Sequence, residues 1–213
     1  FNDFILCLGF KKQVIKDFFL NYEAHTKDFT ILLGKQGAID FHTDHDESGW
    51  KITLADTGLN SMTGARIAKI KKYIGNEDFM LTYGDGVGDV DIDKLLAFHK
   101  SHGKALTVTG VRPPGRFGEL VGEEGRVIEF NEKPQATGGR ISGGFFVASA
   151  CLFDYLNDDE GLVFEQEPMR KLVADRELMV YEHDNFWQPM DTSRDYRFLN
   201  ELYDKGKAPW VTW

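Results

Sequence analysis

Two hydrophobic periods alternate along this chain. Apolar runs of about four to eight residues are typical of strands in a buried sheet, and the segments between them repeat apolar side chains every three or four positions, as amphipathic helices do. The predicted strands span residues 4–9, 29–33, 38–43, 50–56, 79–83, 105–111, 141–149 and 178–181. The predicted helices span residues 12–22, 63–74, 91 or 93 to 103, 152–156, 169–176 and 195–204. This alternation predicts an α/β fold with a largely parallel sheet.

The stretch 112–118 interrupts both periods, because its two prolines and two glycines break helices and strands alike. A hairpin is predicted directly after it, over residues 119–130, with its turn at 123–125. The chain shows no repeats, low-complexity tracts or linker, so we predict one domain over residues 1–213.

Composition limits the partners. The 213 residues carry a formal net charge of −9, which disfavours nucleic acid and anionic membranes as binding surfaces. No apolar run reaches the roughly 18 residues of a membrane span. Cys7 and Cys151 lie in apolar runs and read as buried side chains of a protein in a reducing compartment, so we expect a cytoplasmic protein.

In open parallel sheets, ligands bind beyond the carboxyl ends of the strands. Asp85 follows a predicted strand at such an end, between Gly84 and Gly86, which leave room for a large ligand. A carboxylate there is suited to Mg²⁺ bound to phosphates. The alternative is an ordinary Asp-Gly turn.

Two further strand ends carry charge. Asp191 follows Phe186-Trp187-Gln188-Pro189-Met190, where either it or Thr192 fits the N-cap of the last helix, and a second metal-binding aspartate is the alternative. Lys133, before Pro134, is a compact cation able to neutralise a phosphate, or else a surface charge in a turn.

Glycines and hydroxyls mark two more places. Gly143 and Gly144 begin a strand with bare backbone on which a sugar ring could pack, or else they form a bulge. Ser61 and Arg66 lie where a strand end meets a helix N-terminus, which fits an anion or nucleobase site as well as a capped helix with a solvated arginine.

The paired histidines, His42 with His45 and His99 with His102, lack the fixed partners of a metal motif. We interpret them as solvated.

The order of these motifs along the whole chain resembles the glucose-1-phosphate cytidylyltransferases, a branch of the sugar-nucleotide pyrophosphorylase family. The resemblance is carried by the stretches 56–58, 83–86, 113–118, 132–134, 143–146, 165–168, 186–192 and 206–210. It implies a Rossmann-like mixed, mostly parallel sheet flanked by helices, with a small hairpin and C-terminal sugar-binding portion.

The resemblance also implies a reaction, in which CTP and α-D-glucose 1-phosphate give CDP-glucose and pyrophosphate with Mg²⁺, supplying deoxysugars of O-antigen or other surface lipopolysaccharide. By position, Asp85 and Asp191 correspond to the metal ligands and Lys133 to the sugar-phosphate contact. Glu132 and Gly144 correspond to contacts with the glucose hydroxyls, while Ser61, Arg66 and Gly84 correspond to the nucleotide site. Family members are typically homo-oligomers.

One departure stands out. The family begins with a strand and a Gly-x-Gly-Thr-Arg loop that grips the nucleotide phosphates, and this chain has neither. We therefore expect the chain to be truncated at its N-terminus by about one βα unit, roughly 30 residues. Two hypotheses compete with a CTP-specific enzyme: a non-catalytic sugar-phosphate-binding or assembly module, and an enzyme specific for UTP or dTTP.

Overall fold

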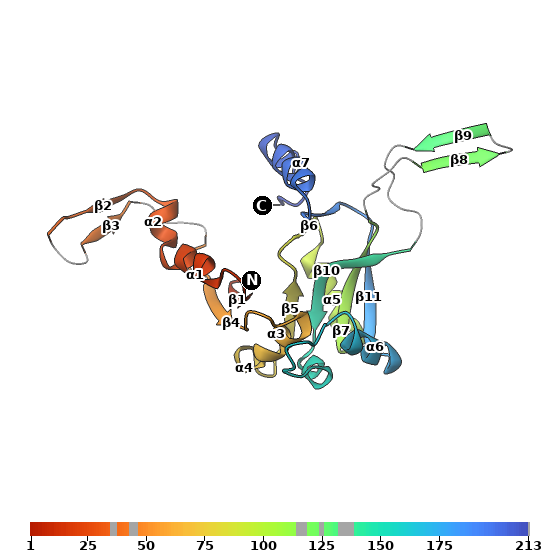
Figure 1. Cartoon of the computed structure of the whole chain (residues 1–213), viewed down its shortest axis with the longest axis horizontal. Helices are drawn as coiled ribbons and strands as arrows, with labels where there is room; N and C mark the ends of the chain where they lie inside the picture. The colour runs from red at the N-terminus through yellow and green to blue at the C-terminus, as the bar shows by residue number, and fades with distance from the viewer. Residues whose placement is uncertain (35–37, 43–46, 114–118, 124–125, 132–138, 213) are drawn as a thin grey trace. The chain divides into compact units, whose positions relative to one another are not determined.

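The computed structural model describes residues 1–34, 38–42, 47–113, 119–123, 126–131 and 139–212 (Figure 1). The chain forms two compact units: unit 1 comprises Phe1–Gly75 with Leu156–Pro168, and unit 2 comprises Asn76–Tyr155 with Met169–Trp213. The single domain expected from the sequence stays a prediction. In the described part of the chain, no helix combines the length and apolar character that crossing a membrane requires.

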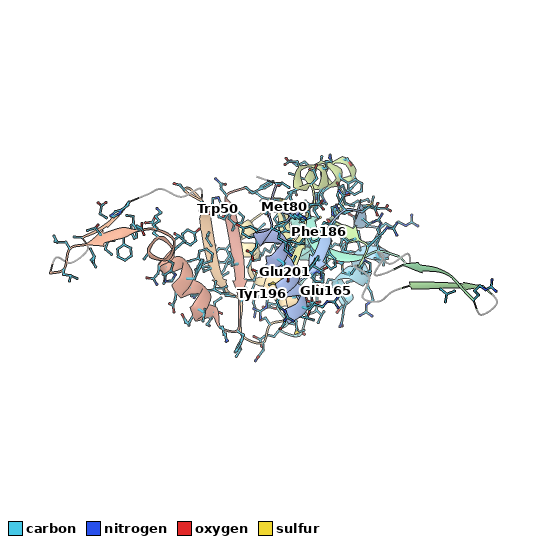
Figure 2. All side chains as sticks on the ribbon, turned by 90° about the horizontal axis from the view of Figure 1, so that it is seen from above. Trp50, Met80, Glu165, Phe186, Tyr196 and Glu201 are labelled. Atoms are coloured by element: carbon cyan, nitrogen blue, oxygen red, sulfur yellow. The ribbon has the colours of Figure 1, made fainter. Side chains whose placement is uncertain are left out.

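Unit 1 is built on two parallel strands, β1 (Asp3–Leu8) and β4 (Lys51–Asp56), paired in register from Asp3↔Lys51 to Leu8↔Asp56. Between them come α1 (Lys12–Leu20), α2 (Tyr22–Thr26), β2 (Phe29–Ile31) and β3 (Ile39–Phe41). After β4 the chain forms α3 (Thr63–Lys69) and α4 (Lys71–Ile74). Trp50, just before β4, packs its ring on Phe4 with centroids 4.8 Å apart (Figure 2).

The core of unit 1 lies under α3, where Ala65 and Ile67 are buried. The returning segment 156–168 meets this helix closely, since Gly64 donates its N–H to the carbonyl oxygen of Leu162 at 2.9 Å. A Cβ on Gly64 would come within 2.9 Å of Leu162, so only glycine permits this approach.

Helix α1 departs from its predicted role. Its apolar positions predicted one buried face, but Val14 is 64% exposed and none of its residues is buried. Its aromatic residues pack on neighbours close in sequence instead, as where Phe18 meets Phe19 edge-on with centroids 5.2 Å apart. An amphipathic period shows that a helix has an apolar face, but not that a partner covers it.

Unit 2 is built on a four-stranded sheet in the order β11 (Leu178–His183), β7 (Leu106–Val111), β10 (Ile141–Ala148), β5 (Phe79–Thr82) (Figure 1). β11 runs parallel to β7, and β10 runs antiparallel to both β7 and β5. Three of these four strands therefore point the same way, and the predicted mixed, mostly parallel α/β fold is confirmed.

Helix α5 (Ile92–His102) packs against β7, β10 and β11. Leu95 and Val147 are buried between them, with Val90 completing the cluster. Asp91 is the N-cap of α5, since its side chain accepts from the N–H of Lys94 at 3.0 Å.

The interpretation of His99 as a solvated side chain is wrong, because His99 is 1% exposed. Its Nδ1 lies 2.9 Å from the hydroxyl of Thr107, and its Nε2 lies 3.0 Å from the hydroxyl of Ser149. His102 contacts the same Thr107 hydroxyl at 2.8 Å and accepts from the N–H of Lys104. That backbone donor keeps Nδ1 of His102 unprotonated, so its Nε2–H donates to Thr107, whose own hydroxyl donates to His99.

Apart from the last helix, which has 12 residues, the remaining elements of unit 2 are short. They are β6 (Gly86–Gly88), the hairpin β8 (Glu119–Glu123) with β9 (Arg126–Asn131), a 3₁₀ turn (Ala150–Tyr155), α6 (Glu167–Ala174, whose first two residues belong to unit 1), β12 (Trp187–Pro189) and α7 (Ser193–Asp204). The hairpin matches its prediction. β6 and β12 pair antiparallel with each other, and the hydrophobic pattern predicts neither of them.

Candidate functional site

Three connections of unit 2 leave its sheet at one edge. β5, β7 and β11 all end there, and β10, which runs the other way, begins there (Figure 1). The segments after Thr82, after Val111 and after His183 therefore emerge side by side, together with Gly144 at the start of β10. The predicted site residues of unit 2 belong to these segments, as expected for the carboxyl edge of a parallel arrangement.

Asp85 and Asp191 are brought together by the ribbon of β6 and β12. Pro189 pairs with Gly86, and one step further the N–H of Met190 donates to the carbonyl oxygen of Asp85 at 2.7 Å. Asp85 is thus a ladder neighbour of Met190, and Asp191 is the next residue along. Residues far apart in sequence become neighbours through this pairing.

The two readings of Asp191 can now be separated, because Thr192 is the N-cap of α7. Thr192 accepts from the N–H of Asp195 at 3.2 Å, and the Asp195 carboxylate accepts from the N–H of Thr192 at 3.0 Å. This capping box satisfies the helix start without Asp191. Asp191 is exposed and does not serve as the cap.

The donor set suits a hard cation. The Asp85 and Asp191 side chains are both exposed, and neither makes a hydrogen bond or ion pair with the residues that the structure describes. Within the same residues, no group of three or more His, Cys, Asp or Glu side chains is arranged for a metal ion. Two exposed carboxylates on neighbouring segments suit Mg²⁺ in residue type, because this ion takes one or two protein carboxylates and completes its shell with water and phosphate oxygens.

Glycines shape the same edge. Gly144 has φ +78°, and a Cβ there would lie 3.1 Å from Cδ2 of Tyr83. Its carbonyl accepts from the N–H of Tyr83 at 3.2 Å, and the pairing of β10 with β7 shifts register at this point. The predicted bulge is therefore present. Gly84 is exposed, and a Cβ on it would meet nothing within 4 Å.

Trp187 is a site residue that the hydrophobic pattern does not single out. Its indole Nε1–H donates to the carbonyl oxygen of Gly143 at 2.8 Å, which ties the ribbon to β10. Because the acceptor is a backbone carbonyl on a strand 44 residues away, the sequence around Trp187 could not predict this contact.

Ser61 and Arg66 lie in unit 1, where both organise a loop. The Ser61 hydroxyl is buried, donates to the carbonyl of Thr57 at 2.6 Å and accepts from Nζ of Lys69 at 2.8 Å. Nη1 of Arg66 donates to the Thr57 hydroxyl at 2.8 Å and to the carbonyl of Gly58 at 3.0 Å. Arg66 is therefore not the solvated arginine of the simpler reading, and its guanidinium holds the carboxyl ends of β1 and β4 together through a further bond to the Leu8 carbonyl.

Next to this loop is an open hollow of about 380 Å³, lined by Ala55, Asp56, Thr57, Gly58, Lys69, Lys72 and Tyr73. The Lys12 ammonium, bonded to the Asp56 carboxylate, holds the pKa of Asp56 below its usual value. The hollow at the end of β4 thus combines the ionised carboxylate of Asp56 with Lys69 and Lys72.

Glu132 and Lys133 lie outside the described residues. The chain that carries them leaves the sheet at Arg112 and returns at Arg140, and both arginines pair with Asp184, at 3.0 Å each. Hydrogen bonds from Arg140 and then Arg112 hold the pKa of Asp184 below its usual value.

Comparison with known proteins identifies the family. The sequence model of the family described as Nucleotidyl transferase matches residues 11–205. The chain is 46% identical to the glucose-1-phosphate cytidylyltransferase of Salmonella typhi over 213 residues, all of this chain and 82% of that enzyme. It is 40% identical to the probable glucose-1-phosphate cytidylyltransferase of Bacillus subtilis (strain 168) over 212 residues, again with 82% of that enzyme covered.

A solved structure supports the fold alone. HddC from Yersinia pseudotuberculosis complexed with GMP-PN superposes with a TM-score of 0.59 at 18% identity, covering 93% of this chain and 77% of that one. The family match over residues 11–205 and the identity to curated enzymes over the whole of this chain establish that the chain belongs to the glucose-1-phosphate cytidylyltransferases within the nucleotidyl transferase family.

Proposed function

We propose that the protein transfers the cytidylyl group of CTP to α-D-glucose 1-phosphate, giving CDP-glucose and pyrophosphate. The relatives in Salmonella typhi and Bacillus subtilis are named for glucose 1-phosphate and a cytidylyl group, and both align with this chain from end to end. The structural observation that carries the proposal is the ladder bond between Met190 and Asp85, which makes Asp85 and Asp191 neighbours at the sheet edge.

The chemistry needs little from the protein beyond positioning. The second pKa of a phosphate monoester is about 6, so the glucose 1-phosphate is largely a dianion at neutral pH and needs no general base. One of its oxygens forms a bond to the α-phosphorus of CTP, and the bond from that phosphorus to the bridging oxygen breaks. The electron pair leaves with pyrophosphate. The barrier is the approach of two anions, which positioned cations and carboxylate-bound metal lower.

Asp85 and Asp191 are the residues that would hold Mg²⁺. An ion held there would supply positive charge to offset that of the phosphates. The two carboxylates are exposed and, within the described part of the chain, free of other partners, so no existing interaction has to break for them to bind it.

The other predicted residues divide between the two substrates. Lys133 is proposed to neutralise the sugar phosphate, with Glu132 and the backbone of Gly144 at the glucose hydroxyls. Gly84 is proposed to admit the nucleotide. Since the polar groups of Ser61 and Arg66 are already bonded within unit 1, we propose that they act on the nucleotide by shaping the loop 57–61.

The test is nucleotide choice. The natural full-length protein is supplied with glucose 1-phosphate and CTP, UTP or dTTP in turn, and pyrophosphate release is measured. CTP is expected to give the highest kcat/KM. Activity with UTP or dTTP but not with CTP contradicts the cytidylyl assignment. Absence of pyrophosphate release with all three nucleotides contradicts the proposed enzymatic activity.

We also propose a homo-oligomer that acts in the cytoplasm and supplies deoxysugars of surface polysaccharide. Exposed apolar side chains in unit 1, among them Val14, Leu20 and Leu33, support association between copies. Light scattering of the purified protein tests this, and a monomer at micromolar concentration contradicts it.

A further inference from the structure

The ribbon of β6 and β12 has little to hold it in shape by itself. Each strand is three residues long, and two of the residues of β6 are glycines. Isolated two-stranded ribbons are marginally stable. Because Asp85 and Asp191 flank this ribbon at one end, whatever fixes the ribbon also fixes how close the backbones of these two residues lie.

A histidine and an aspartate close the opposite end. His183 is the last residue of β11, and Asp89 directly follows β6. Nε2 of His183 lies 3.0 Å from Oδ1 of Asp89 and 3.2 Å from the carbonyl oxygen of Phe186. The N–H of Asp89 donates to that same carbonyl at 3.2 Å. The pair thus joins the main sheet to both strands of the ribbon at the Phe186 carbonyl.

Burial gives these contacts their weight. His183 is 6% exposed, and Oδ1 of Asp89 is shielded from solvent. In the described part of the chain, the imidazole is the one polar group that reaches this oxygen, and it lies alongside rather than pointing its N–H at it. The imidazole therefore offsets the desolvation of this oxygen by its closeness, while the hydrogen bonds that hold the ribbon are those of His183 and of the Asp89 N–H to the Phe186 carbonyl.

We propose that His183 and Asp89 are positioning residues for the metal site. They contact neither of the proposed ligands, but they fix the far end of the ribbon and so set the spacing of Asp85 and Asp191 for one divalent cation. The inference rests on the proposed role of those two aspartates.

The test measures metal binding without turnover. Mn²⁺ replaces Mg²⁺, no nucleotide is added because nucleotides bind the ion themselves, and the free ion is followed by electron paramagnetic resonance. His183→Ala and Asp89→Leu are each expected to weaken Mn²⁺ binding by about tenfold at most, the lower end of the effect of losing a direct partner of a metal ligand, because they act on the ligands only through the ribbon. The double variant is expected to bind no more weakly than either single one, because the two residues act as one pair.

Two further variants keep the test decisive. His183→Gln retains an N–H for the Phe186 carbonyl and is expected to weaken Mn²⁺ binding less than His183→Ala. It is used in place of His183→Ala if the alanine variant does not fold. His99→Gln alters a buried histidine of the same unit whose partners are Thr107 and Ser149, so it is expected to lower the denaturant midpoint and leave Mn²⁺ affinity unchanged.

Unchanged Mn²⁺ affinity in folded His183 and Asp89 variants overturns the positioning role, and so does a loss no larger than that in His99→Gln. Asp85→Asn separates this failure from failure of the proposed function. If Asp85→Asn binds Mn²⁺ as tightly as the unaltered protein, the metal site itself is misassigned and the inference falls with it.

Discussion

The indole of Trp187 donates to the carbonyl oxygen of Gly143 across 2.8 Å, so one side chain ties the ribbon of β6 and β12 to β10. Trp187→Phe keeps an aromatic ring but removes the donor. We expect a loss of about 1 kcal/mol in the free energy of unfolding, the usual net value of one hydrogen bond, together with a lower kcat. Urea unfolding and steady-state kinetics measure the two. The control is Trp210→Phe, at a ring that packs on Phe186, which is expected to leave kcat nearly unchanged. Equal effects of the two substitutions contradict the assigned role.

Gly144 is held in a conformation that only glycine adopts freely. Gly144→Ala meets both the positive φ and the ring of Tyr83 at 3.1 Å, so we expect a destabilisation of about 1–3 kcal/mol. Gly103→Ala is the matched control, because Gly103 has φ +64° and a Cβ there would meet nothing within 4 Å. The difference between their unfolding free energies isolates the contact with Tyr83, and no difference shows that the contact costs nothing.

The buried His99 makes stability depend on pH. Burial is the main cause that lowers its pKa, and the nearby His102 lowers it further. The unfolded chain then binds more protons than the folded one near pH 6.5. The contribution of His99 to the free energy of unfolding is therefore full above about pH 6.5 and is lost as pH falls. We expect His99→Gln to reduce this slope in unfolding experiments between about pH 5 and 8. If the free energy of unfolding of His99→Gln depends on pH as steeply as that of the unaltered protein, groups other than His99 cause the acid sensitivity.

Asp184 pairs with both arginines that flank the segment carrying Glu132 and Lys133. Its carboxylate is well exposed, so Asp184→Asn is expected to change stability by less than about 1 kcal/mol. We expect a higher KM for glucose 1-phosphate and an unchanged KM for CTP, since the segment tied by Asp184 is the one proposed to contact the sugar phosphate. A rise in the KM for CTP alone contradicts this division. The lowered pKa of Asp184 also gives the direction of the pH dependence. The ion pairs with the two arginines stabilise the protein at neutral pH and are lost as pH falls through that pKa.

The main strands and the edge that holds the site were predictable, because both follow from local pattern. Long apolar runs predict β5, β7 and β11, and polar residues directly after them are placed at one edge by the parallel direction alone. Asp85 could be named as a candidate for that reason, whereas Asp191 could be named only from the apolar stretch 186–190 that precedes it.

The ribbon that makes those two residues neighbours was not predictable. Gly86-Val87-Gly88 and Trp187-Gln188-Pro189 have neither strand period nor strand composition, and each becomes a strand only by pairing with the other. The choice between Asp191 and Thr192 as N-cap likewise depended on whether Asp195 would complete a capping box.

Burial was the other blind spot. His99 is polar and lies on a helix face, yet Thr107 in β7 and Ser149 just after β10 give it two hydroxyl partners, and neither belongs to its own helix. Conversely, α1 has a clear apolar face, but none of its residues is buried. Periodicity reports which side chains share a face, and partners from distant elements decide the environment of that face.

The account depends most on the two neighbouring aspartates, and pyrophosphate release by Asp85→Asn tests them most directly. The substitution removes a charge without changing shape, and Asp93→Asn, at an exposed aspartate in the first turn of α5, is the control. With CTP, glucose 1-phosphate and Mg²⁺, we expect Asp85→Asn to lower kcat by about a thousandfold, as loss of charge stabilisation at a reacting phosphate does, and Asp93→Asn to leave it unchanged. Undiminished turnover in Asp85→Asn would contradict the metal-binding role of Asp85 and, with it, the proposed site.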